Sequence, residues 1–241
     1  MPPIVLNTMP KSGSVYILGT LASSLSIERY NKPICHGFFP EFFMIPAALH
    51  RLSLGNVARQ EHFNASLLNI DICSNYFRRM VLHVRDPLQA TLSWTHHVNR
   101  HLTRHPEQPY VHGSQYDPPV DFLHWSLEQQ ISWHIERFFV GSVKWLQEWL
   151  DYQKSGGPIA VLVTTHDDLV ADERAFFDRI LNFFDIPDSR FRWRPEDKTI
   201  ENHFRSGNPS EWTIVFTEAQ KKRCLELLDR ALLERFGWPT A

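Results

Sequence analysis

Three short apolar runs recur along the chain, at residues 4–6, 80–84 and 159–164. The first two are each followed by turn-forming residues, at 10–14 and 85–87, and then by apolar residues at helical spacing. This order indicates a strand, a loop and a helix, and it is repeated. Strands that alternate with helices predict a parallel sheet connected through crossover helices.

The predicted fold is therefore α/β, a three-layer sandwich with a central, mostly parallel sheet and helices on both faces. Further amphipathic stretches extend the helical layers, at 121–152 as one long helix or a broken pair, at 175–184 and at 217–236. Thr217 and Gln220 are spaced as a capping box for the last of these. Sheets of this kind bind ligands at the carboxyl ends of their strands. The loops that follow the strands are therefore where we expect the chemistry.

The composition predicts one globular domain over residues 1–241, since 43% of the residues are hydrophobic and 22% are charged. The segment at about 95–119 is rich in histidine and proline and poor in aliphatic residues, so we expect a lid or loop insertion there. A net charge of -2 argues against a nucleic-acid binder and mildly against a polyanionic acceptor. Any anion site must therefore be local.

Cysteine usage and hydropathy predict a cytoplasmic protein. Cys35, Cys73 and Cys224 lie far apart and form no CxxC pair, so neither a disulfide framework nor a zinc site is indicated. No apolar run approaches the roughly 20 residues of a membrane span, and no signal-peptide pattern opens the sequence.

A metal site is not expected at the histidine-rich segment either. His97, His101 and His105 recur every four residues and would share one face of a helix. Arg100 and Arg104 lie beside them, which favours a solvated face over a cluster of metal ligands.

Two segments after strands contain candidate anion-binding residues. Lys11-Ser12-Gly13-Ser14 precedes a helix, whose N-terminal N–H groups favour an anion; a solvated turn is the alternative. Arg85-Asp86-Pro87 ends the second strand, and Ser93 follows two helical turns later. A guanidinium and a hydroxyl so placed suit one phosphate, although an Arg-Asp pair also ties a strand end to a helix start. A third segment, 204–212, carries one cation and several small residues and would alone be read as a surface turn.

Together and in this order, the three segments resemble the family of sulfotransferases that depend on 3'-phosphoadenosine-5'-phosphosulfate (PAPS), of the cytosolic, small-molecule type. The family's TYPKSGTTW-like loop is matched at Thr8, Pro10, Lys11, Ser12 and Gly13. Its RxPxxxxxS-like segment is matched at Arg85, Pro87 and Ser93. Its RKGxxGDW-like loop is matched in part, at Arg205, Gly207 and Trp212, with Ser206 in place of a basic residue.

The resemblance implies a P-loop NTPase-like sulfotransferase fold and transfer of a sulfonate group from PAPS to a hydroxyl, or an amine, of a small acceptor, releasing PAP. It assigns the 5'-phosphosulfate to Lys11, Ser12, Gly13, Ser14 and Val15, and adenine stacking to Tyr16. It assigns the 3'-phosphate to Arg85 and Ser93, capped by Arg205, Ser206 and Gly207. Val15 stands where the family usually has a hydroxyl, and Ser206 removes a charge, so the donor affinity is expected to be weaker than is typical.

The resemblance also implies a histidine base about twenty residues before the phosphate-binding arginine, and His62 occupies that position. Histidine accepts a hydroxyl proton near neutral pH. Glu61 is the alternative base, because related carbohydrate-modifying enzymes use a glutamate, and His36 is a more distant competitor. Lys11 is expected to stabilise charge on the departing phosphate.

Two other functions share parts of this pattern. A P-loop kinase of small molecules would use the same strand, loop and helix, but the chain has no GxxxxGK[ST] sequence. A catalytically silent nucleotide-binding module would bind PAP without transferring a sulfonate group.

Overall fold

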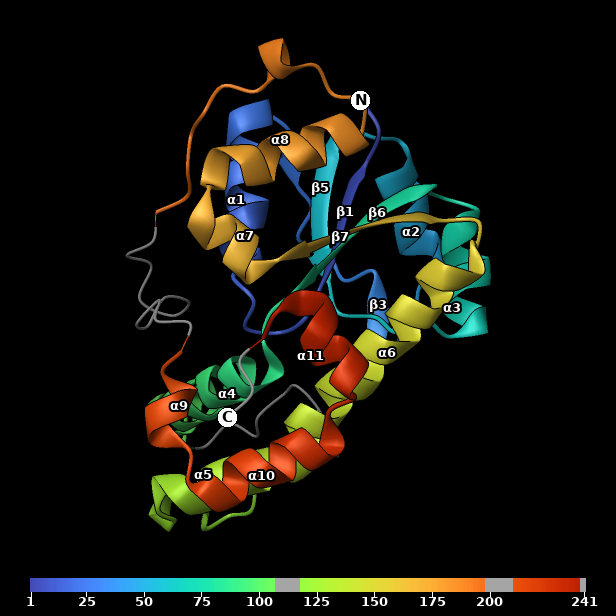
Figure 1. The fold of residues 1–241 in the computed structure, drawn as a ribbon. Coiled ribbons are helices and arrows are strands. Elements are labelled where there is room, and N and C mark those ends of the chain that lie inside the picture. The colour runs from blue at the N-terminus through green and yellow to red at the C-terminus, as the bar shows by residue number, and fades with distance from the viewer. Residues whose placement is uncertain (107–117, 198–209, 239–241) are drawn as a thin grey trace. The chain divides into compact units, whose positions relative to one another are not determined.

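The computed structural model describes residues 1–106, 118–197 and 210–238. Five strands of this part of the chain form one sheet in the order β2-β5-β1-β6-β7, and each neighbouring pair is parallel. Their bounds are β1 Ile4–Thr8, β2 Glu28–Arg29, β5 Val57–Glu61, β6 Arg79–Val84 and β7 Ala160–Thr165. The predicted α/β fold with a parallel central sheet is confirmed (Figure 1).

The apolar runs correspond to β1, β6 and β7. All five residues of β1 are buried, as is typical of a central parallel strand that is covered on both faces. The sequence did not predict β5, because Val-Ala-Arg-Gln-Glu ends in three polar residues. The last of them, Glu61, is nevertheless buried.

Helices cover both faces of the sheet and give the three expected layers (Figure 1). One face carries α1 Ser14–Leu25, α7 His166–Ala171 and α8 Glu173–Phe183, and the other carries α2 Pro46–Ser53 and α3 Leu67–Ser74. The core of the first face consists of apolar side chains from strands and helices, among them Leu6, Val81, Leu21, Phe177 and Ile180. This packing fixes the strand ends from which the loops emerge.

A two-stranded antiparallel hairpin follows β2 in the chain. It pairs β3 Cys35–Phe38 with β4 Glu41–Met44. Asn69 of α3 holds β4, since its amide nitrogen donates to the Phe42 carbonyl at 2.7 Å and its oxygen accepts from the Met44 N–H at 3.1 Å.

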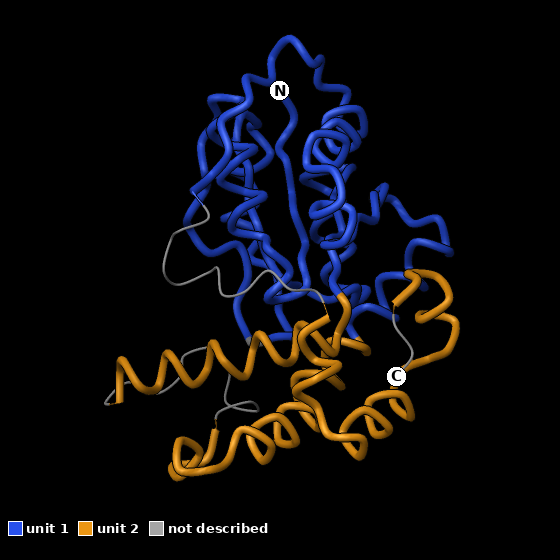
Figure 2. Tube along the Cα trace, turned by 60° about the vertical axis from the view of Figure 1, so that its left-hand side comes forward, with its two compact units in different colours: residues 1–85, 145–204 blue, residues 86–144, 205–241 orange. Residues whose placement is uncertain are grey.

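The chain divides into two compact units (Figure 2). Unit 1 comprises residues 1–85 and 145–204 and contains the parallel sheet, while unit 2 comprises residues 86–144 and 205–241 and is helical where the structure describes it. The single domain over residues 1–241 stays a prediction. None of the described helices is long and apolar enough to cross a membrane.

The expected loop at 95–119 is wrong for its first ten residues, because α4 runs from Pro87 to Arg104. Thr95 and Val98 are buried, and Trp94 stacks on Phe138 with ring centroids 4.7 Å apart. Burial of one helix face thus outweighs the polar composition that suggested a loop. Residues 107–117 of the predicted lid lie outside the described residues.

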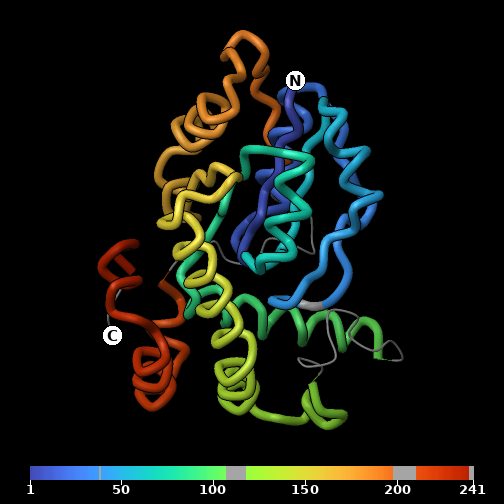
Figure 3. Tube along the Cα trace, turned by 90° about the vertical axis from the view of Figure 1, so that its right-hand side faces the viewer, coloured from blue at the N-terminus to red at the C-terminus, as the bar shows by residue number. Residues whose placement is uncertain are grey.

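The segment expected as one long helix or a broken pair is helical from Leu127 to Ser155. It consists of α5 Leu127–His134, a π-helix Ile135–Phe139 and α6 Val140–Ser155, and a 3-10 helix Phe122–His124 precedes it. Helix α5 lies beside α10 Glu218–Leu227 (Figure 3), and the Gln220 amide of α10 donates to the Glu128 carbonyl and the Ser132 hydroxyl at 2.8 and 2.9 Å.

The last predicted helix, 217–236, is two helices, α10 and α11 Arg230–Phe236. The predicted capping box is present, with Thr217 Oγ1 accepting from the Gln220 N–H and Gln220 Oε1 from the Thr217 N–H. The break comes at Asp229, whose carboxylate accepts from the Ala231 N–H at 2.9 Å and caps the new helix. A short helix α9, Trp212–Val215, precedes this pair.

The three cysteines are buried free thiols. Burial raises the pKa of the Cys224 thiol to about 12, and it raises those of Cys35 and Cys73 further. The thiols are therefore protonated at neutral pH, and no disulfide is present.

We predict that His134 makes unit 2 sensitive to acid. Its ring is fully buried and neither ring nitrogen has a hydrogen-bond partner among the described residues. Burial, with a smaller contribution from Arg137, lowers its pKa from 6.5 to about 3. The unfolded chain therefore binds more protons below pH 6.5, so this contribution to stability is complete above that pH and falls toward pH 3.

From pH 8 to pH 5, His134 should cost about 2 kcal/mol of unfolding free energy, measured by urea denaturation at each pH. His134→Phe should remove that part of the pH dependence, since a phenyl ring of similar size binds no proton. An unchanged pH dependence in the variant would contradict the prediction.

Candidate functional site

The loop between β1 and α1, Met9 to Gly13, is the centre of the candidate site. It begins at the carboxyl end of the central strand and turns sharply. Lys11 and Gly13 both adopt left-handed backbone conformations, with φ of 68° and 89°. Such a conformation costs glycine little conformational energy but is strained for lysine. The surrounding contacts must therefore hold Lys11 in it.

Three carbonyl groups of this loop are held by side chains of unit 1. The Ser12 hydroxyl donates to the Met9 carbonyl at 2.7 Å. Arg85 Nη1 donates to the Lys11 carbonyl at 2.9 Å. His83 Nε2 lies 2.9 Å from the Ser12 carbonyl.

These contacts determine where the loop's N–H groups point. A trans peptide directs its C=O and N–H to opposite sides. Holding the carbonyls of Lys11 and Ser12 therefore turns the N–H groups of Ser12 and Gly13 away from Arg85 and His83. A run of N–H groups that face one side is a typical cradle for an anion.

Helix α1 extends this cradle. Its N-cap is Gly13, no side chain caps it, and its first turn carries no acidic residue. The N-terminal N–H groups of a helix and its positive dipole end favour an anion. Ser14, Val15 and Tyr16 form this first turn, where the sequence predicts 5'-phosphosulfate and adenine contacts.

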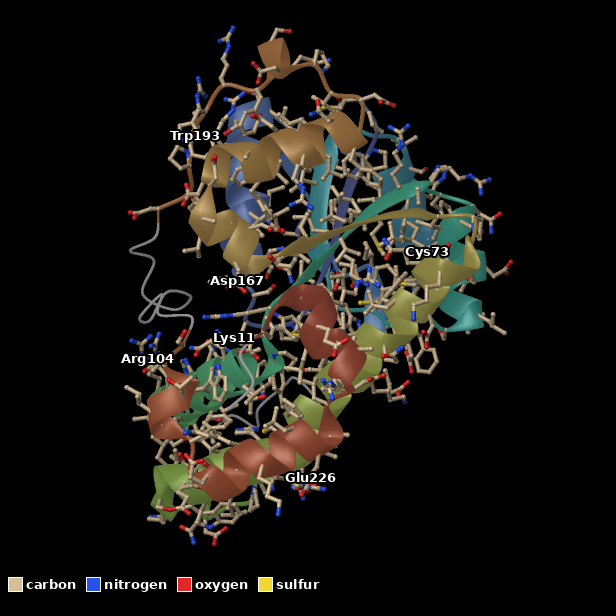
Figure 4. The ribbon with its side chains drawn as sticks, viewed as in Figure 1. Lys11, Cys73, Arg104, Asp167, Trp193 and Glu226 are labelled. Atoms are coloured by element: carbon tan, nitrogen blue, oxygen red, sulfur yellow. The ribbon has the colours of Figure 1, made fainter. Side chains whose placement is uncertain are left out.

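Lys11 adds a cation at the same end of the sheet. Figure 4 shows Lys11 there together with Asp167, which follows β7. The loop thus combines one ammonium group with main-chain donors, although the chain as a whole carries a charge of -2.

The predicted 3'-phosphate residues are distributed over both units. Arg85 is buried at the end of β6 in unit 1, and its bond to Lys11 uses one of five guanidinium N–H groups. Ser93 lies on α4 in unit 2 and is half-buried. Their joint contact with a phosphate stays a prediction. Arg205, Ser206 and Gly207 lie outside the described residues.

His62 follows β5 and lies beside the end of β1. The parallel register pairs Asn7 with Glu61, which places His62 next to Thr8. His62 Nδ1 lies 2.5 Å from the Thr8 carbonyl, and its Nε2 lies 2.9 Å from the Gln60 amide nitrogen. A carbonyl only accepts, so Nδ1 carries the proton and Nε2 has the basic lone pair.

The Phe63 carbonyl fixes the chain directly after His62. It accepts three hydrogen bonds, from Asn7 Nδ2 at 2.9 Å, Trp145 Nε1 at 2.7 Å and Trp149 Nε1 at 2.9 Å. The Phe63 ring also packs edge-on against Trp149. Strand β1 and the two tryptophans of α6 therefore share in positioning His62.

Glu61, the alternative base, is engaged elsewhere. Its two oxygens hold Arg59, in a salt bridge, and the Cys35 thiol at 3.2 Å. Because successive residues of a strand face opposite sides, Glu61 points away from the side of Gln60 and His62. The role of His62 as the base stays a prediction.

Tyr16 and His166 border the loop. The Tyr16 hydroxyl donates to Glu173 at 2.9 Å, and burial together with Glu173 raises its pKa to about 12. The His166 ring lies 3.6 Å from the point where a side chain on Gly13 would begin. Burial, then the charge of Arg85, lowers the pKa of His166 to about 3, so it is neutral at pH 7.

The histidines of α4 do not form a metal site within the described residues. No group of three His, Cys, Asp or Glu side chains suited to a metal ion occurs in residues 1–106, 118–197 and 210–238. His97 instead packs on Trp94, and His101 on His105.

The sequence interpretation missed three kinds of positioning group. His83 was read only as part of an apolar strand, Trp145 and Trp149 as helix core, and Asn7 not at all. The signal for His83 and Asn7 was a polar residue inside a buried strand, where it needs a hydrogen-bond partner.

Comparisons with known proteins bear on the family and the fold of this chain. A sequence profile of the family described as sulfotransferase domain matches residues 1–235. A search of curated protein sequences gave no match.

Similar folds occur in several solved structures. The mouse sulfotransferase SULT7A1 in complex with PAP is 16% identical, with a TM-score of 0.58 over 94% of this chain and 82% of that one. The sulfotransferase domain from the curacin biosynthetic pathway is 10% identical, with a TM-score of 0.60 over 100% and 99%. A sulfotransferase from Alicyclobacillus acidocaldarius is 16% identical, with a TM-score of 0.53 over 98% and 99%. At these identities the likeness is one of fold.

We predict that Gly13→Ala weakens binding of PAP, the nucleotide product that the sequence predicts. A side chain at φ 89° costs about 1 to 2 kcal/mol. Relief of that strain would turn the Gly13 peptide, and with it two N–H groups of the cradle. Calorimetric titration should show at least a tenfold loss of PAP affinity.

Gly156→Ala is the matched control. Gly156 has a φ of 70° and nothing within 4 Å of an added side chain, and it lies at the end of α6. The control should lose similar stability in thermal unfolding but keep its PAP affinity. Equal PAP affinities of Gly13→Ala and Gly156→Ala would contradict the prediction that the loop at Gly13 binds the nucleotide.

Proposed function

Because this chain belongs to the sulfotransferase domain family, we propose that it transfers the sulfonate group of PAPS to a hydroxyl or amine of a small acceptor and releases PAP. The observation that carries the choice of donor is the loop from Met9 to Gly13, whose carbonyls are held by side chains, which leaves its N–H groups on the side where an anion would bind. Residues 1–241 would act as one domain. The buried free cysteines support a reducing compartment, the cytoplasm.

The donor would lie along the end of the sheet. Its 5'-phosphosulfate would be bound by Lys11 and by the N–H groups of Ser12, Gly13, Ser14 and Val15. Its adenine would stack on Tyr16, whose hydroxyl is already oriented by Glu173. Arg85 and Ser93 would bind the 3'-phosphate, with Arg205, Ser206 and Gly207 closing over it.

The reaction would be an in-line displacement at sulfur, analogous to phosphoryl transfer. The acceptor oxygen or nitrogen forms a bond to sulfur while the bond between sulfur and the 5'-phosphate oxygen breaks. The acceptor's proton passes to His62 Nε2, and the bonding pair stays with the phosphate oxygen. Lys11 and the loop N–H groups stabilise the charge that develops there.

The position of the proton on His62 decides which ring nitrogen can act as the base. Nδ1–H is engaged with the Thr8 carbonyl, so only Nε2 accepts the acceptor's proton. The Gln60 amide now bonded to Nε2 would give way to the acceptor. The resulting imidazolium would be stabilised by the same Thr8 carbonyl, a role that a carboxylate performs in many histidine-based sites.

The acceptor is proposed to be small and without multiple negative charges, since a net charge of -2 argues mildly against a broad basic groove. No nucleic-acid partner is proposed, for the same reason.

Lys11→Ala should lower kcat by about 10² to 10³, as does loss of one donor to a developing oxyanion. Transfer from labelled PAPS to a panel of hydroxyl and amine acceptors gives the rate. Lys32→Ala removes an equal charge from an exposed position and should leave kcat unchanged. Near-normal turnover by Lys11→Ala would remove Lys11 from the mechanism.

His62→Ala should bind PAP with normal affinity but lose about 10² to 10⁴ in kcat, the usual share of a general base. His36→Ala, at an exposed position of β3, and Glu61→Gln test the two competitors. His36→Ala should keep wild-type turnover. Activity retained in His62→Ala and lost in Glu61→Gln would transfer the role to Glu61.

A further inference from the structure

His83 lies behind the anion loop and connects it to the neighbouring strand β7. Its ring is fully buried on β6, two residues before Arg85. Both ring nitrogens have partners: Nε2 lies 2.9 Å from the Ser12 carbonyl, and Nδ1 lies 2.9 Å from Thr164 Oγ1 on β7. The backbone carbonyl of the same residue accepts from the Met9 N–H at 2.8 Å.

We propose that His83 is a positioning residue for sulfonate transfer, which orients the Ser12–Gly13 peptide so that its N–H group faces the donor's phosphosulfate. This inference rests on the proposed function. It adds to that function a residue that would contact neither the donor nor the acceptor.

The partners fix the position of the proton on His83. The Ser12 carbonyl only accepts, so the proton is on Nε2, and Nδ1 accepts from the Thr164 hydroxyl. Burial is the main cause that lowers the pKa of His83 to about 4, with Arg85 lowering it further and Asp168 and the Ser12 bond opposing. The ring is therefore neutral at pH 7 and has this single tautomer.

The ring of His83 is held by its two hydrogen bonds and by its packing. The register of the sheet pairs His83 with Thr8 on one side and with Thr164 on the other. Phe176 packs edge-on against the ring, with centroids 5.5 Å apart. The Nε2–H group therefore points at one place, the carbonyl of Ser12.

Loss of the bond between His83 and the Ser12 carbonyl would change the shape of the anion site as well as the packing of the core. Ser12 is fully buried, so its carbonyl would be left without this donor in a place that water does not reach. A buried acceptor without a partner is costly, and rotation of the peptide is the simplest relief. Rotation would turn the Gly13 N–H away from the anion.

The experiment uses two variants that separate the two ring nitrogens. In His83→Gln the side-chain amide extends to the position of Nε2 and can donate to Ser12. In His83→Asn the shorter amide reaches only the position of Nδ1 and can bond Thr164 but not Ser12. His83→Phe removes both bonds while it keeps a ring of similar size.

Binding of PAP is measured by calorimetry, and kcat and KM are measured for PAPS and for the acceptor, below the unfolding temperature of each variant. We expect His83→Asn and His83→Phe to lose PAP affinity at least tenfold, to raise the KM for PAPS and to leave the KM for the acceptor unchanged. His83→Gln should recover most of the affinity.

Equal PAP affinities in the Gln and Asn variants would overturn the proposal, and this pair decides it even where the Phe variant does not fold. A lower unfolding temperature with unchanged PAP affinity and KM for PAPS would reduce His83 to a structural role. Wild-type protein that neither binds PAP nor transfers from PAPS would instead overturn the proposed function, and the inference with it. The two failures are thus distinguishable.

Discussion

The candidate site depends on the geometry of the trans peptide, which sends a carbonyl and the following N–H in opposite directions. Arg85 and His83 hold the carbonyls of Lys11 and Ser12, and a left-handed turn at Gly13 leads into helix α1. The side chains of Arg85 and His83, which lie behind the loop, therefore determine the direction in which its N–H donors point. This explains how a chain with a net charge of -2 can present a loop suited to an anion with one lysine in it.

Strand β1 links the two halves of the proposed chemistry. Its last residue, Thr8, leads into the anion loop and also accepts from His62. One residue earlier, Asn7 donates to the Phe63 carbonyl, which Trp145 and Trp149 also bind. The base and the anion loop thus share one short, fully buried strand as their common support, and a shift in that strand would move both.

Sequence patterns predicted the parts of the molecule that depend on local physics. Apolar runs located β1, β6 and β7, and turn residues located the loop at Lys11 to Gly13. The features that the sequence did not predict depend on contacts between residues that are distant in the chain. Strand β5 was missed since its polar side chains are satisfied by one another, by the Tyr30 carbonyl and by Cys35 of the hairpin. Residues 95–104 form a helix because their apolar face is buried. The bonds of His83 could not be predicted, because Ser12 and Thr164 are 71 and 81 residues away.

Main-chain donors have a consequence for how such a site changes over evolutionary time. A side-chain ligand is lost by one mutation, whereas an N–H group is present in every residue except proline. Selection on the loop is therefore expected to act mostly on the few residues that set its shape, such as Gly13, Arg85 and His83. A loop whose donors are main-chain groups can therefore accept substitution at most of its positions while its anion-binding groups stay in place.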